Sequence, residues 1–113
     1  MHRPIYNMLG LAKRAGFIVS GSDMVLAAIR RRRAHLVIVS QDAADNTKKC
    51  FRDKCAYYQV PYYEFGDKWT LGKSIAKQMR VSLALTDAGF AQALVKKLDE
   101  TTKGGNNGES EST

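Results

Sequence analysis

This chain of 113 residues has few of the residue types that build special sites: two cysteines, two histidines, two prolines and one tryptophan. Cys50 and Cys55 are five positions apart, which places them about 140° apart on a helix, so they are badly placed to pair with each other. Without a neighbouring histidine they also make a poor zinc site. We therefore expect reduced cysteines that serve packing, as in a cytoplasmic protein.

Long hydrophobic runs are absent as well. The longest apolar stretches, MVLAAI and LVIV, are too short to cross a bilayer. The first residues, MHRP, lead into the helix-like segment IYNMLGLAKRAG and not into the apolar run and cleavage site of a secretory signal. We expect a cytoplasmic protein that does not use a membrane.

Residues arranged for catalysis are also scarce. His2 lies near the chain end, His35 precedes an apolar segment, and neither has a patterned partner. No Walker loop, dinucleotide fingerprint or nucleophile elbow occurs. Asp42 and Asp45 resemble the acidic loop of some phosphoryl-transfer sites, but helix capping explains them without chemistry, and an enzyme would need a metal or phosphate ligand besides. We predict a protein that is not an enzyme and has no cofactor or metal.

Positive charge is what the chain has in excess. The net charge is +7, and the last fifteen residues hold four acidic side chains against one lysine, so the residues before Asp99 carry +10. A basic body of this size is typical of proteins that bind nucleic acid or another anionic surface, although it also serves solubility alone.

Periodicity predicts a chain in which helices and strands alternate. Leu36–Val39 is a continuous apolar run, which is typical of a strand covered on both faces. Helices are expected at about 4–15, 22–32, 46–58, 70–77 and from Thr86 or Asp87 to Leu98, and strands at 17–20, 36–39, 62–65 and 81–85. This order predicts an α/β fold, a three-layer α/β/α sandwich with a mixed, mostly parallel four-stranded sheet. We expect residues 1–98 to form one domain and residues 99–113 to form a disordered acidic tail.

Short patches in a fixed order give the chain a family resemblance. They are LGLAKRAG, SGSD, LVIVSQDA, VPYYEF, TLGKSI and RVSLALTDAGF. Together they resemble the kink-turn RNA-binding superfamily of ribosomal protein L-seven-Ae, in particular its bacterial YlxQ-type branch, over about Ile5 to Leu98. The resemblance implies an α/β/α sandwich that binds structured RNA without catalysis, as a monomer, with ribosomal RNA as one candidate ligand.

The family motif Gly-x-Asn-Glu-x-x-Lys, which opens the second helix and grips the G·A pairs of a kink-turn, falls on Gly21 to Ala27. Gly21 keeps the glycine, while Asp23, Met24 and Ala27 stand at the Asn, Glu and Lys positions. Asp23 accepts hydrogen bonds from guanine but cannot donate as Asn does. Met24 can pack or stack, and Ala27 removes a phosphate contact.

A second family element, a loop that covers a flipped-out nucleotide, corresponds to about Gln78–Ser82. Gln78 and Arg80 offer donors there, and Val81 offers apolar surface; alternatively Val81 only begins a strand and Arg80 is a solvated flank. Lys13 and Arg14 are expected beside the start of the second helix as phosphate contacts, or only complement the end of the first helix. The candidate RNA-binding residues are therefore Lys13, Arg14, Gly21, Ser22, Asp23, Met24, Gln78, Arg80 and Val81.

Two further regions are basic or aromatic. Arg30–Arg33 is expected at the far end of the second helix, about 15 Å from Asp23, where it contacts flanking phosphates, binds a second anionic surface or caps the helix. Trp69 is expected to be exposed, and Gly66–Gly72 around it is the second candidate for RNA contact. A rival hypothesis is a protein-interaction module on the same fold, because Met24, Leu26 and Ala27 make the motif face apolar.

Overall fold

The protein is described here by a computed structural model that covers residues 2–104, with side chains as far as Thr101. Every helix and strand predicted from the sequence is present. In chain order the elements are α1 (Arg3–Arg14), β1 (Ile18–Ser20), α2 (Ser22–Arg30), β2 (Leu36–Val39), α3 (Asp45–Tyr58), β3 (Tyr62–Glu64), α4 (Lys68–Ser74), β4 (Ser82–Leu85) and α5 (Ala88–Gly104).

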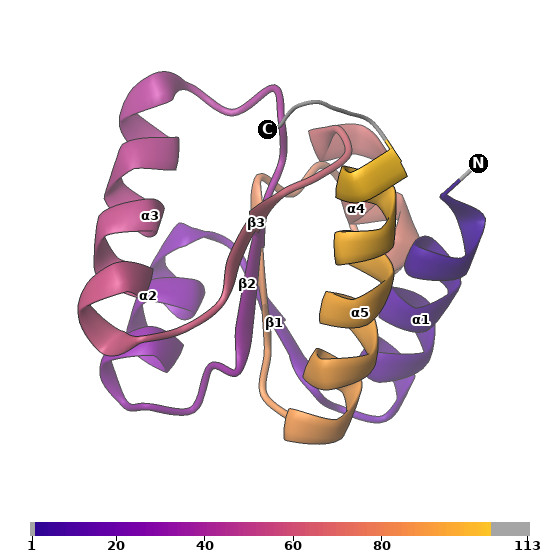
Figure 1. Cartoon of the computed structure of the whole chain (residues 1–113), viewed down its shortest axis with the longest axis horizontal. Helices are drawn as coiled ribbons and strands as arrows, with labels where there is room; N and C mark the ends of the chain where they lie inside the picture. The colour runs from indigo at the N-terminus through magenta and orange to yellow at the C-terminus, as the bar shows by residue number, and fades with distance from the viewer. Residues whose placement is uncertain (1, 105–113) are drawn as a thin grey trace.

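The elements form three layers with the sheet in the middle (Figure 1). Helices α2 and α3 cover one face, and α1, α4 and α5 cover the other. All four residues of β2 are buried, as predicted for a strand covered on both sides. Leu36 and Ile38 pack toward α1, α4 and α5, whereas Val37 and Val39 pack toward α2 and α3. The alternating faces of one apolar strand therefore serve two separate cores.

The sheet is mixed, but the prediction that it is mostly parallel is wrong. The strand order is β1-β4-β2-β3, and only β2 and β3 are parallel, since β4 runs antiparallel to both β1 and β2. The reason lies in α4, which has seven residues and is about 10 Å long. Because α4 and the turn after it stay at the edge where β3 ends, β4 starts from that edge and runs back.

The last helix extends beyond the domain boundary predicted at Leu98. Helix α5 continues to Gly104, so residues 99–104 of the predicted tail are helical, and residues 105–113 lie outside the described part of the chain. Tyr63 of β3 donates a hydrogen bond to the Asp99 carboxylate, which ties this extension to the sheet. Burial and the nearby Asp99 both raise the pKa of Tyr63.

The two cysteines have different surroundings, and both are free thiols. Cys55 is buried against α2 and the sheet, and burial raises its pKa to about 12. Cys50 is exposed, so the packing role predicted for both cysteines is wrong for this one. Within residues 2–104, no helix is long and apolar enough to cross a membrane.

Candidate nucleic-acid interface

The chain places four segments at one edge of the sheet, the upper end in Figure 1, where β1, β2 and β3 end and β4 begins. We call this surface the loop edge and define it as residues 20–24, 40–43, 66–69 and 78–82. Backbone hydrogen bonds join the segments. The amides of Gly21 and Ser40 donate to the carbonyls of Ser82 and Val81 at 3.1 and 2.8 Å, and the amides of Gln41 and Arg80 donate to those of Gly66 and Lys68 at 2.7 and 2.9 Å. The loop edge is therefore one connected surface.

The start of α2 lies at one side of the loop edge, next to the outer strand β1. Gly21 has φ 91° and ψ 148°, a conformation that glycine adopts far more readily than other residues. No side chain of the described residues caps α2, so the amides of its first turn remain available to an anion. Ser22, Asp23 and Met24 are exposed beside them.

The loop before β4 lies directly against this helix start. Arg80 Nε donates to Ser20 Oγ at 3.0 Å, and Arg80 Nη1 donates to the Met79 carbonyl at 2.8 Å. Arg80 is thus anchored beside Gly21 and is not a freely solvated flank. Gln78 is exposed, but Val81 precedes β4 and packs against the core under α2 and α3.

The second candidate region, Gly66–Gly72, turns out to be continuous with the first. Trp69 is 63% exposed, as predicted, and the Lys68 amine lies 5.8 Å from its ring centre. Gly72 packs so closely under the 78–80 loop that a Cβ there would lie 1.7 Å from the Gln78 carbonyl oxygen. Sequence spacing could not show this contact, because it depends on how the segment that joins α4 to β4 folds back over α4.

The aspartate side chains at the loop edge accept hydrogen bonds from backbone amides. Asp42 accepts a hydrogen bond from the Lys68 amide at 3.1 Å, so it caps α4 and not the helix that follows it in the sequence. Asp67 accepts from the Thr70 amide and hydroxyl, both at 2.8 Å, and these bonds lower the pKa of Asp67. Among residues 2–101, no three His, Cys, Asp or Glu side chains gather into a group that could hold a metal ion.

Lys13 and Arg14 do not join the loop edge. The carbonyl of Phe17 accepts from the Thr86 amide, while Gly21 bonds to Ser82, so the two ends of β1 face opposite ends of β4. The end of α1 therefore lies at the other end of the sheet from Gly21, and the predicted placement of Lys13 and Arg14 beside the start of α2 is wrong. The reason is that the chain crosses the whole sheet along β1 before α2 begins.

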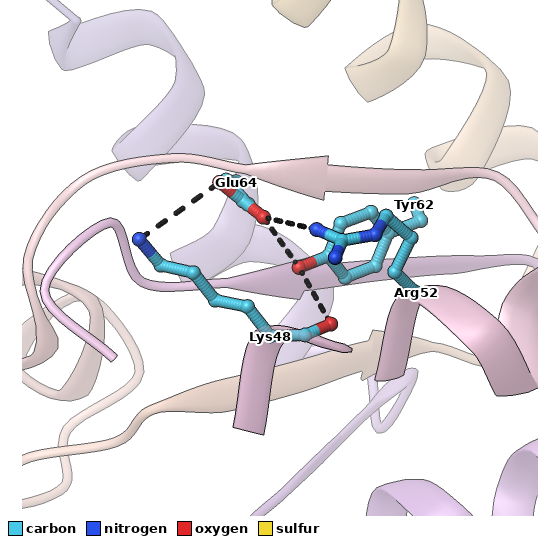
Figure 2. Close-up of polar contacts among 4 residues, drawn as sticks. All are labelled: Lys48, Arg52, Tyr62 and Glu64. Carbon is cyan, nitrogen blue, oxygen red and sulfur yellow. Dashed lines mark hydrogen bonds and ion pairs between the residues drawn. The ribbon is translucent and has the colours of Figure 1, made fainter. Parts of the chain in front are cut away.

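The basic residues of α3 are partly neutralised within the molecule. Figure 2 shows Glu64 of β3 between Lys48 and Arg52 of α3, with ion-pair distances of 4.0 and 3.5 Å. The Tyr62 hydroxyl donates to Glu64 at 2.8 Å, and burial together with this carboxylate raises the pKa of Tyr62. Much of the charge on α3 is therefore already paired.

The family follows from a direct comparison of the sequence. Residues 3–95 match the model of the ribosomal protein L7Ae/L30e/S12e/Gadd45 family. The chain belongs to that family. The match spans both layers of helices and the entire sheet, so it includes every segment of the loop edge.

Named relatives agree with this assignment. RNA-binding protein YlxQ of Bacillus subtilis (strain 168) is 49% identical over 94 residues, covering 83% of this chain and 94% of the relative. RNA-binding protein YlxQ of Enterococcus faecium is 39% identical over 98 residues, covering 87% and 90%. The predicted family, including the YlxQ-type branch, is confirmed. The comparisons agree with the prediction that the chain is not an enzyme.

Solved structures show the same fold. A protein with unknown function from Bacillus halodurans C is 39% identical and superposes with a TM-score of 0.82, covering 84% of this chain and 96% of the other. A Giardia lamblia 15.5kD RNA binding protein gives a TM-score of 0.73 at 22% identity, covering 86% of each chain, and this likeness concerns the fold alone.

Proposed function

We propose that this protein binds RNA through the loop edge and prefers RNA with a sharp bend of the kink-turn type. One observation carries the proposal: the uncapped start of α2 and the Arg80 loop are joined into one surface by the Gly21–Ser82 and Arg80–Ser20 hydrogen bonds. The relatives named as RNA-binding proteins support the choice of RNA over other polyanions.

Each part of the loop edge has a chemical role in this proposal. The amides at the start of α2 bind a phosphate, and Asp23 accepts hydrogen bonds from a guanine edge. Trp69 and Met79 are 63% and 44% exposed and offer flat or flexible apolar surface to an unstacked base. The folded RNA must present a bend and a flipped-out base together, which a plain duplex does not do.

Titration of the full-length chain against three RNAs tests the proposal: a kink-turn RNA, a plain duplex and a single strand, each over a salt series. We expect the kinked RNA to bind at least tenfold more tightly than the other two. Arg80→Ala should weaken binding of the kinked RNA about tenfold, because it removes a positioned cation from the loop. Lys96→Ala removes the same charge from the exposed side of α5 and should change that affinity less than twofold.

Two results would contradict the proposal in different ways. Equal affinity for all three RNAs would remove the preference for a bend and leave general polyanion binding. Absence of RNA binding would favour the rival function, a protein-interaction module. Met24 supports that rival, since it is 58% exposed on the motif face. Purification from nuclease-treated extract then separates the two, because only a protein partner persists without RNA.

Ribosomal RNA is the first natural ligand to test, because ribosomal proteins give the matched family its name. In this proposal the protein acts as a monomer, with one loop edge for each bend. Chemical footprinting on ribosomal RNA should then show protection confined to bent segments.

A further inference from the structure

A groove runs along the exposed side of α2, away from the loop edge. It has a volume of about 300 Å³ and lies between α2 and the turn that joins α1 to β1. Val19, Ala27 and Ala28 form its apolar floor, Met24 lines its end near Gly21, and Arg31 and Arg33 line the end beyond the helix. Met24 and Ala27 share one face of α2, and Arg31, the first residue after the helix, continues that face because the three are spaced by three and four positions.

The three arginines that follow α2 lie on two sides of that helix. Helix α2 ends at Arg30, and the amide of Arg33 bonds to the Ala28 carbonyl at 2.9 Å, which closes the turn. Arg32 has a φ of 57° and turns away, with its guanidinium 5.2 Å from the ring centre of Tyr58 on α3. Arg31 and Arg33 are left to line the groove.

Charge in the groove has one sign. None of its lining residues is acidic, and within the part of the chain that the structure describes, neither Arg31 nor Arg33 forms an ion pair. Both side chains are exposed. An apolar floor with two unpaired guanidinium groups at one end is complementary to a nucleotide, which presents a flat base and an anionic phosphate.

We propose that this groove binds a second segment of RNA, which continues from the loop edge past Met24 and places its phosphates on Arg31 and Arg33. Met24 to Arg31 spans about 10 Å along the helix axis, so a strand can follow α2 without leaving the surface. The inference rests on the proposed function in taking RNA as the ligand. It adds that recognition extends beyond the bend to a flanking strand.

The test compares two RNAs: a minimal kinked RNA, and the same RNA extended by a single-stranded flank. We expect the flank to increase affinity of the unaltered protein about tenfold. The double variant Arg31→Ala/Arg33→Ala should lose this gain, with the slope of log affinity against log salt falling by about 1.4, and should bind the minimal RNA within twofold of the unaltered protein. Lys96→Ala/Lys97→Ala removes the same charge from the helix on the opposite face and should keep the gain.

A second variant addresses the groove without removing an arginine. Thr86 also lines the groove, and Thr86→Glu places a carboxylate beside the two guanidinium groups. This variant should lose the gain from the flank as the double variant does. Circular dichroism and thermal melting confirm that each variant is folded before its affinity is measured.

The outcomes separate this inference from the proposed function. If the minimal kinked RNA binds and the flank adds nothing, or the double variant keeps the gain, the groove inference is overturned while the loop-edge proposal stands. If a kink in the RNA does not increase affinity, but the protein binds single-stranded RNA and Arg31→Ala/Arg33→Ala weakens that binding, the loop-edge proposal is overturned and the groove inference is supported. Binding of polyglutamate in the groove, with no effect of the double variant on either RNA, would overturn the inference in favour of an acidic protein partner.

Discussion

The two ends of the sheet are built on different physical principles. At the loop edge the shape is fixed: backbone hydrogen bonds join four segments, and two aspartates cap α4. At the other end, which holds Arg31 and Arg33, few contacts fix the side chains but their charge is unpaired. The loop edge is suited to recognising a shape, and the arginine end is suited to holding a chain of phosphates.

A count of charges does not by itself separate a candidate binding surface from other basic regions. Helix α3 carries Lys48, Lys49 and Arg52, yet each of them forms an ion pair with Glu64 or Asp53. The arginines that follow α2 have no acidic partner in the described structure. Availability of charge, which depends on neighbours in space, therefore distinguishes a candidate binding surface from a solvated helix face.

The largest effect is expected from Gly72→Ala, directly under the 78–80 segment of the loop edge. The new methyl group would lie 1.7 Å from the Gln78 carbonyl oxygen, so the 78–80 loop must move, and we expect the free energy of unfolding to fall by about 3 kcal/mol. Gly89→Ala is the matched control on α5, since the nearest contact of its new Cβ is a side-chain oxygen of Asp87 at 3.2 Å and not a backbone atom at 1.7 Å. Urea denaturation measures both variants, and equal stabilities would show that the loop is not held rigidly.

A glycine at each end of β1 gives a direct comparison of the two ends. Gly21→Ala and Gly16→Ala both place a side chain at positive φ, 91° and 84°, with no heavy atom within 4 Å of the new Cβ. The cost is conformational, about 1–3 kcal/mol for Gly21 and about 1–2 kcal/mol for Gly16. Only Gly21→Ala should also weaken binding of the kinked RNA. Similar affinity losses in the two variants would remove the distinction between the two ends of the sheet.

The smallest effect concerns pH, at Asp67. Hydrogen bonds from Thr70 lower the pKa of Asp67, so the carboxylate stabilises the fold above its unfolded pKa of about 3.9, and the stabilisation is lost as pH falls through the folded pKa. Asp67→Ala should therefore lower the melting temperature at neutral pH, and its difference from the unaltered protein should shrink on acidification. A difference that stays constant down to pH about 2 would contradict a role for the charged cap.

Much of the fold follows from local sequence patterns. The apolar run Leu36–Val39 and the periodicity of the helices depend on neighbours in the chain, so they identified the elements and the family. Element ends were less predictable. Helix α2 stops at Arg30 because the chain turns at Arg32, and α5 runs on past Leu98 to Gly104.

What tertiary structure alone decided is which distant segments meet. The motif at Gly21 and the Arg80 loop were identified from the sequence, but their hydrogen-bonded contact, and the addition of Lys68 and Trp69, depend on β4 running antiparallel between β1 and β2. The same topology put Lys13 and Arg14 at the far end of the sheet. Local patterns determine the helices and strands, because the interactions that form each element lie within a few residues of the chain. The strand order depends on the whole chain, because both apolar faces of the sheet must be covered by helices at the same time.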